Sequence, residues 1–134
     1  MNKSIVITSI FEPTEAIIEF SKLKDYQLIV VGDKKSPNDW YCDNVDYISI
    51  QKQENIGYEL AKMLPYNHYC RKMVGYLKAI QNGAKYIIDT DDDNIPKTNW
   101  NFPMFDQSYD CIEDDKGFVN IYQLYTNQKI WARG

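Results

Sequence analysis

The stretch Tyr86-Ile87-Ile88-Asp89-Thr90-Asp91-Asp92-Asp93-Asn94 decides how this chain is organised. An apolar run enters it, and four carboxylates follow within five residues. The apolar residues predict a strand, so the acids fall at its carboxyl end, the edge at which open α/β sheets bind their ligands. Three consecutive aspartates repel one another, and a bound cation relieves that repulsion. The stretch therefore predicts the cation-binding end of a site at the edge of a sheet.

The spacing of the acids suggests which of them bind the cation. Mg²⁺ and Mn²⁺ take one or two carboxylates beside phosphate oxygens and waters, so we predict Asp91 and Asp93 as the metal ligands. A solvated acidic loop is the alternative interpretation. An EF-hand counted from Asp89 fails, because Asn94 and Trp100 stand where glycine and glutamate are required.

Three apolar runs earlier in the chain predict further strands, over residues 5–10, 28–31 and 47–50. Between the first two, apolar residues at helical spacing predict a helix over 14–23 with Thr14 as its N-cap. Continuously apolar runs suit parallel strands that are covered on both faces. The order strand, helix, strand, loop, strand predicts the opening of a doubly wound α/β sheet.

Two helices are predicted between the third strand and the acidic stretch. The first covers 53–64, and the second begins at an N-cap, Asn67, and ends at Gly83. Beyond the acids, residues 95–105 predict a loop with aromatic anchors, and residues 118–125 predict a further strand. In the second helix, Met73, Leu77 and Ile80 are predicted to share an apolar face, with Cys70 and Val74 beside them.

Composition limits the classes of function. The chain has 134 residues, 44% hydrophobic and 25% charged, which predicts one globular domain over residues 1–134. A net charge of −4 without a basic run argues against nucleic acid as a partner. No apolar run approaches the ~20 residues of a membrane span, and the N-terminus lacks a signal-peptide layout. The three cysteines form no CxxC pair, which argues against a disulfide framework or a zinc site and predicts a reducing, cytoplasmic location.

Polar residues near the other strand and helix ends are candidates for ligand binding. Arg71 and Lys72 oppose the dipole at a helix N-terminus unless an anion such as a diphosphate docks there; solvated basic side chains are the alternative. Gly75 is explained by close packing against the sheet or a ligand. Asp33 could accept hydrogen bonds from a ribose or base, or be an ordinary turn aspartate. The single histidine, His68, suits a helix N-terminus or the surface better than a catalytic base.

Three blocks of the sequence, residues 30–37, 71–84 and 90–94, together resemble the STELLO-type glycosyltransferases. Those proteins are similar to GT-A glycosyltransferases and, more distantly, to the reversibly glycosylated polypeptides that act as UDP-arabinopyranose mutases. The resemblance implies an α/β domain of GT-A type, with a Rossmann-like, mostly parallel sheet flanked by helices. It also implies a short or truncated version of that fold, in which the acceptor half is reduced or missing.

The resemblance further implies roles for single residues. Asp91 and Asp93 would be the acids of a DxD element that holds Mn²⁺ or Mg²⁺. Asp33 would contact the nucleoside, and Arg71 the base or the diphosphate. Arg133, in a W-A-R-G segment like the family's W-P-R-G, is a speculative site of sugar attachment. The predicted nucleotide-sugar-binding residues are Thr8, Asp33, Lys34, Arg71, Lys72, Gly75, Asp91 and Asp92.

These features together predict a metal-dependent glycosyltransferase-type domain. It would bind a UDP- or GDP-linked sugar and transfer the hexosyl or pentosyl group to an acceptor. One alternative is a non-catalytic nucleotide-sugar-binding or interaction module. A cation-dependent phosphohydrolase that uses the acidic cluster is a further alternative.

Overall fold

The computed structural model describes residues 3–102, 108–113, 115, 117 and 119–130. The chain divides into two compact units, Met1–Trp100 and Asn101–Gly134. The first unit contains the sheet and the candidate site. The single domain predicted over residues 1–134 stays a prediction. None of the described helices combines the length and the apolar character that a membrane span requires.

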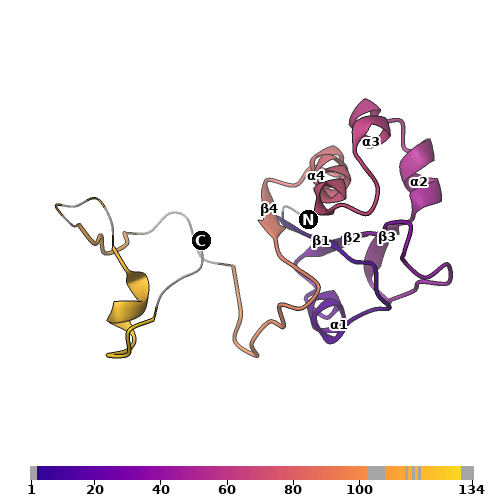
Figure 1. Ribbon diagram of the computed structural model, residues 1–134. Helices are drawn as coiled ribbons and strands as arrows, with labels where there is room; N and C mark the ends of the chain where they lie inside the picture. Colours follow the sequence, from indigo (N-terminus) through magenta and orange to yellow (C-terminus); the bar gives the residue numbers. More distant parts are fainter. Residues whose placement is uncertain (1–2, 103–107, 114, 116, 118, 131–134) are drawn as a thin grey trace. The chain divides into compact units, whose positions relative to one another are not determined.

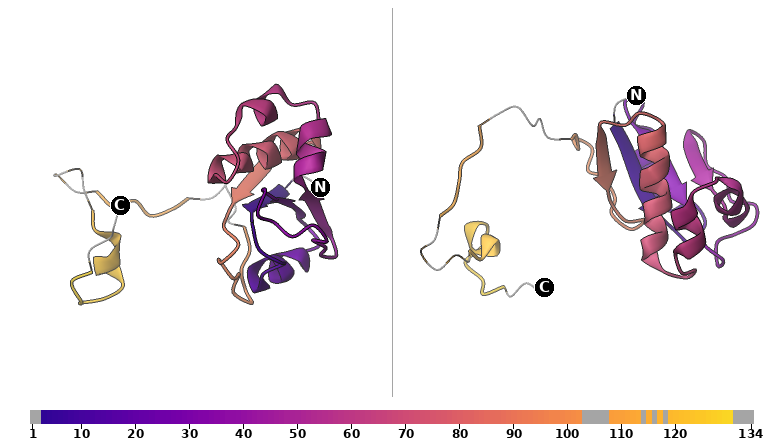
Figure 2. Two further views of the ribbon diagram at one scale, coloured as in Figure 1. Left: turned by 45° about the vertical axis from the view of Figure 1, so that its right-hand side comes forward. Right: turned by 90° about the horizontal axis from the view of Figure 1, so that it is seen from above.

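The first unit is built on a sheet of four parallel strands in the order β3-β2-β1-β4 (Figures 1 and 2). This confirms the predicted Rossmann-like α/β fold. The chain runs outward from β1 to β3 and then crosses to β4 on the other side of β1. Ligands of α/β sheets bind beyond the carboxyl ends of the strands at such a reversal. The strands are β1 (Lys3–Thr8), β2 (Gln27–Val31), β3 (Val45–Ile48) and β4 (Tyr86–Asp89).

Helices cover both faces of this sheet (Figures 1 and 2). One face carries α1 (Glu15–Ser21), which Thr14 caps as predicted, since its Oγ1 accepts a hydrogen bond from the Ile17 amide. The opposite face carries α2 (Ile50–Asn55), α3 (Glu59–Met63) and α4 (Lys72–Gln81).

The single helix predicted over 53–64 is wrong, because this part of the chain forms the two short helices α2 and α3. Gly57 lies between them with a φ of 82°. That left-handed conformation is open to glycine and ends a right-handed helix. Ser49 caps α2, so the helix begins earlier than predicted. The third strand therefore ends at Ile48, before the end of the predicted range 47–50.

The second predicted helix exists but begins differently. Asn67, the predicted cap, has a φ of 54°, and a 3₁₀ turn, η1 (Tyr69–Arg71), precedes α4. His68 caps this turn, with its Nδ1 accepting from the Cys70 amide at 3.1 Å. The histidine therefore serves at a helix N-terminus, as predicted. Gly83, with a φ of 81°, follows the end of α4 as predicted.

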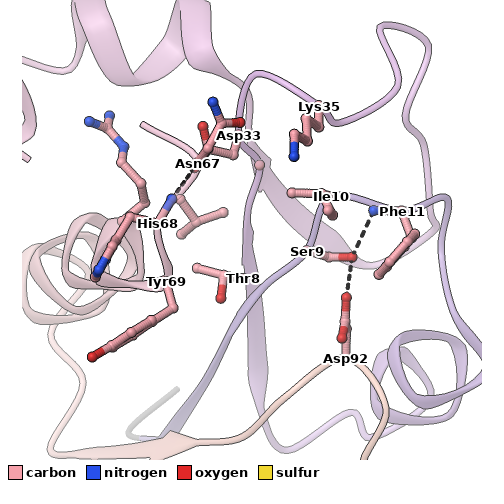
Figure 3. Close-up of a pocket in the computed structure, with 13 residues that line it drawn as sticks. Thr8, Ser9, Ile10, Phe11, Asp33, Lys35, Asn67, His68, Tyr69 and Asp92 are labelled. Atoms are coloured by element: carbon pink, nitrogen blue, oxygen red, sulfur yellow. Dashed lines mark hydrogen bonds between the residues drawn. The ribbon is translucent and has the colours of Figure 1, made fainter. Parts of the chain in front are cut away.

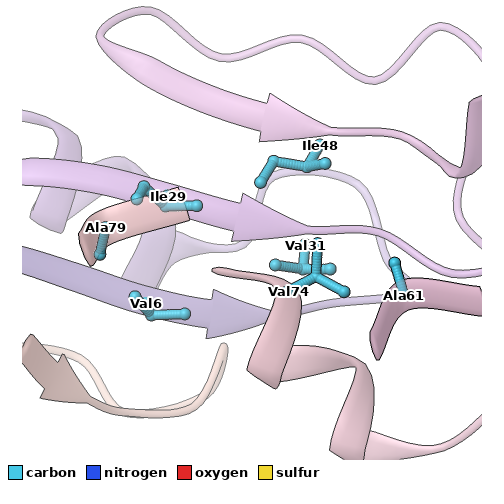
Figure 4. Packing of buried hydrophobic residues seen from close by; sticks show 7 residues of the cluster. All are labelled: Val6, Ile29, Val31, Ile48, Ala61, Val74 and Ala79. Carbon is cyan, nitrogen blue, oxygen red and sulfur yellow. The ribbon is translucent and has the colours of Figure 1, made fainter. Parts of the chain in front are cut away.

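The core between the sheet and α4 is made of small and branched apolar side chains (Figure 4). Val6, Ile29 and Val31 of the sheet meet Val74 and Ala79 of α4. Their neighbours along β1 and β2 point to the other face, because side chains alternate along a strand. Both faces of β1 and β2 are thus buried, as expected of inner parallel strands.

The apolar face predicted for α4 is buried at Val74 but not at Met73 or Ile80. Met73 and Ile80 are 46% and 60% exposed, and Leu77 is half-buried. The helix instead turns Gly75 toward the sheet, where an added Cβ would lie 2.5 Å from Val6 Cγ1 and 2.9 Å from Val31 Cγ2. Gly75 therefore allows the helix backbone to approach β1 and β2 closely, which is the packing role predicted for it.

Replacing Gly75 with alanine is expected to lower the free energy of unfolding by about 1–2 kcal/mol. Alanine gains roughly 0.5–1 kcal/mol of helix propensity, but overpacking costs about 1–3 kcal/mol. Urea unfolding followed by circular dichroism measures the change. The control is Ile80→Ala on the same helix, which should change stability by at most about 0.5 kcal/mol. An alanine variant as stable as the wild type would contradict the close approach.

Beyond β4, the described part of the predicted loop, residues 95–102, is without helix or strand. Trp100 packs edge-on against Phe20, with 5.5 Å between ring centroids, and this confirms an aromatic anchor. The strand predicted over 118–125 is wrong where the chain is described, since Ile121–Leu124 forms a 3₁₀ helix, η2. Asn120 caps it through a bond from the Tyr122 amide, a local interaction that competes with strand pairing.

Candidate functional site

A pocket of about 290 Å³ lies at the carboxyl ends of β1 and β2 (Figure 3). Its walls come from the last residue of each of these strands and the residues that follow it, from η1 and the two residues before it, and from the loop after β4. This is the sheet edge that the sequence predicts for ligand binding. The walls include Thr8, Ser9, Asp33, His68, Tyr69 and Asp92.

The loop after β4, residues 90–94, is here called the acidic loop. It is attached to the end of β1 through Asp92, whose Oδ2 accepts a hydrogen bond of 2.5 Å from Ser9 Oγ (Figure 3). Ser9 is buried and also accepts a bond from the Phe11 amide. Thr14 adds a bond from its Oγ1 to the Asp92 carbonyl. Asp92 lines the pocket, and its binding of a nucleotide sugar stays a prediction.

The three aspartates of the acidic loop point to different partners. Asp91 contacts Lys72, Asp92 contacts Ser9, and the Asp93 carboxylate is exposed without a partner among the described residues. In the part of the chain that the structure describes, no three His, Cys, Asp or Glu side chains gather as a metal site. Mg²⁺ or Mn²⁺ needs only one or two carboxylates when a diphosphate and water supply the rest. The oxygen donors therefore fit such a cation, and the assignment of Asp91 and Asp93 stays a prediction.

Lys72 supplies a cation to the acidic loop from within the protein. Its Nζ lies 2.6 Å from Asp89 Oδ1 and 2.9 Å from Asp91 Oδ1, and it donates to the Thr90 carbonyl. Burial acts to lower the pKa of Lys72, but hydrogen bonds from the ammonium to the two carboxylates outweigh it and raise the pKa. Part of the repulsion among the acids is thus relieved without a metal. Lys72 faces these acids and is not part of the pocket wall.

Arg71 is almost completely buried, at 1% exposed. Its Nε donates to Gln53 Oε1, and its Nη1 donates to the carbonyls of Ala61 and Leu64, each at 2.9 Å. The guanidinium also lies 4.5 Å from the centre of the Tyr66 ring. These bonds connect η1, which leads directly into α4, with α2 and with α3 and its C-terminal end. Arg71 also lines the pocket, although its guanidinium is held by these partners. Its contact with a base or diphosphate stays a prediction, and contact through the guanidinium would require that group to give up these partners.

The remaining predicted binding residues divide into two groups. Thr8 and Asp33 line the pocket, and Asp33 Oδ2 accepts a bond of 3.3 Å from the His68 amide, which holds the wall together (Figure 3). Lys34 and Gly75 are not in the pocket wall. The Lys34 ammonium lies 4.1 Å from the centre of the Tyr66 ring, and Gly75 packs on the sheet. Arg133 lies outside the described residues.

Sequence reasoning missed several residues of the pocket. Ser9 and Lys35 are next to predicted binding residues at strand ends, and that position alone could have indicated them. Phe11 and Tyr69 border the pocket, 59% and 78% exposed. One face of the Tyr69 ring already stacks on His68, with 4.5 Å between the ring centroids, and the rest of the ring is open. Phe11 follows β1 and Tyr69 lies in η1, so no local sequence pattern shows that both border the same pocket.

Two curated proteins match almost the whole chain. They are "Probable glycosyltransferase STELLO1" and "Probable glycosyltransferase STELLO2" of Arabidopsis thaliana. Each is 29% identical to this chain over an alignment of 147 residues, and the alignment covers 98% of this chain. The chain is similar over nearly its whole length to part of these STELLO proteins. It spans 19% of the length of each STELLO protein. No family model matches it.

The similarity to the STELLO proteins confirms the predicted resemblance. Because the match covers 98% of the chain, the similarity extends over the sheet edge that carries the pocket.

Proposed function

We propose that this chain is the donor-binding part of a metal-dependent glycosyltransferase, which binds a nucleotide-diphospho-sugar and transfers the sugar to an acceptor. The observation that carries the proposal is the junction between the pocket and the acidic loop. Ser9 and Asp92 join them where β1 and β4 end. The STELLO similarity supports the same class of reaction.

The pocket is suited to the nucleoside. Its volume of about 290 Å³ is at the lower end of small-molecule sites, which suits one part of a larger ligand. Phe11 offers a ring against which a base can stack, and Tyr69 offers the ring face that is not stacked on His68. The Asp33 carboxylate accepts two backbone amides, from Lys34 and His68, and keeps lone pairs that can accept from a ribose or base.

The diphosphate would extend from the pocket toward the acidic loop. Lys35 lines the pocket and can contribute positive charge to it. Mn²⁺ or Mg²⁺, held by Asp91 and Asp93, would supply charge neutralisation for the departing nucleotide. Asp92 has a different role, because its bonds with Ser9 and Thr14 fix the loop and so orient the two aspartates beside it.

Calorimetric titration with UDP, GDP and their sugar conjugates, with and without Mn²⁺, tests the proposal. We expect Mn²⁺ to raise the affinity for one of these nucleotides by at least about tenfold. Absence of metal-dependent binding at millimolar nucleotide would contradict it. Binding without sugar transfer or hydrolysis would favour the non-catalytic module. Phosphatase activity that Asp91→Asn abolishes, without affinity for nucleotide sugars, would favour the phosphohydrolase.

A further inference from the structure

We infer that Lys72 is the resident counter-ion of the acidic loop, and that a divalent cation has to compete with its ammonium group for Asp91. The inference deepens the proposed function and rests on it, because it concerns the affinity of the same loop for metal. Lys72 would then set how tightly the site binds a metal when no nucleotide is present.

The contacts of Lys72 leave no donor unused. An ammonium group has three N–H donors and no acceptor. The Lys72 Nζ lies 2.6 Å from Asp89 Oδ1, 2.9 Å from the Thr90 carbonyl and 2.9 Å from Asp91 Oδ1. The Lys72 side chain is only 11% exposed, so these protein oxygens are its principal partners. The ammonium is therefore held in place and is not free to turn toward a ligand.

This arrangement places a positive charge directly on a predicted metal ligand. A metal ion on Asp91 can bind beside the ammonium, through the second carboxylate oxygen, or displace it from Oδ1. In the first case the two cations repel each other across a few ångströms. In the second case Lys72 loses a bond and its charge is left with fewer partners. Both routes lower the affinity for metal, and the Coulomb energy at such a distance corresponds to about tenfold or more.

The test is a Mn²⁺ titration of the full chain, with free Mn²⁺ measured by electron paramagnetic resonance. Without nucleotide, Lys72→Met should bind Mn²⁺ about tenfold more tightly than the wild type. Lys72→Arg keeps the charge and should remain close to the wild type. Lys78→Met is the matched control, because it removes the same charge from α4 at the other end of the helix. It should leave the affinity unchanged.

A second measurement is made on the wild type, and the variant serves only to assign the signal. The ¹⁵N NMR signal of the Lys72 ammonium, assigned by its loss in Lys72→Met, should shift when Mg²⁺ is added to the wild type. A signal unaffected by saturating Mg²⁺ would overturn the inference.

The outcomes separate this inference from the proposed function. Equal or weaker Mn²⁺ binding by Lys72→Met would overturn the competition alone, because the lysine would then hold Asp91 in place for the metal. If neither protein bound Mn²⁺, with or without UDP, both the proposed function and this inference would fall.

Discussion

Replacing Arg71 with methionine is expected to lower the free energy of unfolding by about 3–4 kcal/mol, a large part of the stability of a small domain. Methionine fills much of the same space but leaves Gln53 Oε1 and the carbonyls of Ala61 and Leu64 without their donor. Each buried polar group left unsatisfied costs about 1–3 kcal/mol. Urea unfolding followed by circular dichroism gives the difference.

The matched control for Arg71 is Lys62→Met. Lys62 also makes an ion pair, with Glu59, but the two side chains are 62% and 82% exposed. Such surface pairs contribute at most about 1 kcal/mol, so this variant should resemble the wild type. Arg71→Lys should retain only part of the free energy of unfolding that Arg71→Met loses, because an ammonium group cannot reproduce the planar, forked donors of a guanidinium. If Arg71→Met kept the stability and lost nucleotide affinity, the direct contact predicted from the sequence would be right.

The double variant Asp91→Asn with Asp93→Asn is expected to remove the Mn²⁺-dependent part of UDP binding, with a loss of about a hundredfold in affinity. Hard divalent cations prefer charged oxygen ligands, and a neutral amide is a much weaker one. Binding that remains should equal that of the wild type without metal, since the pocket for the nucleoside is intact. Calorimetry with and without Mn²⁺ measures both quantities.

Asp25→Asn is the control for this double variant. Asp25 is exposed and precedes β2, at the amino edge of the sheet, and its substitution removes a charge of the same kind. It should leave the Mn²⁺ dependence of UDP binding unchanged. Equal losses in both proteins would mean that net charge, and not ligation by the acidic loop, controls the affinity.

The sheet could be predicted because its signals are local. Continuous apolar runs indicated the inner strands, and Thr14 and Gly83 indicated a helix start and a helix end. The apolar run before Asp89 also placed the acids at the carboxyl edge, where β4 ends. Each of these signals is contained within a few residues, so neither side-chain packing nor distant contacts were needed to interpret it.

The face of α4 could not be predicted, because residues far away in the sequence determine it. Gly75 fits against Val6 and Val31, and Lys72 is buried only because the acids after β4 accept its bonds. A sequence pattern based on apolar residues places a glycine or a lysine, such as Gly75 or Lys72, on the exposed side of a helix. The sequence pattern alone therefore put Met73 on the wrong side of the helix.

The site shows the same division between local and distant information. Asp92 lies in the pocket wall because Ser9, 83 residues earlier, donates to it. Arg71 is turned inward by Gln53 and by two carbonyls of the chain near α3, none of which is visible in the pattern around it. The spacing of charges thus indicated where a site lies, but not which side chain faces it.

The most direct test of the central claim, that the acidic loop holds a cation that binds a diphosphate, is a crystal structure of the chain with UDP and Mn²⁺. We predict an anomalous manganese peak about 2.0–2.3 Å from carboxylate oxygens of Asp91 or Asp93, with the diphosphate on the same ion and the nucleoside in the pocket beside Thr8 and Asp33. A nucleotide bound away from this edge of the sheet, or manganese that contacts neither aspartate, would contradict the claim.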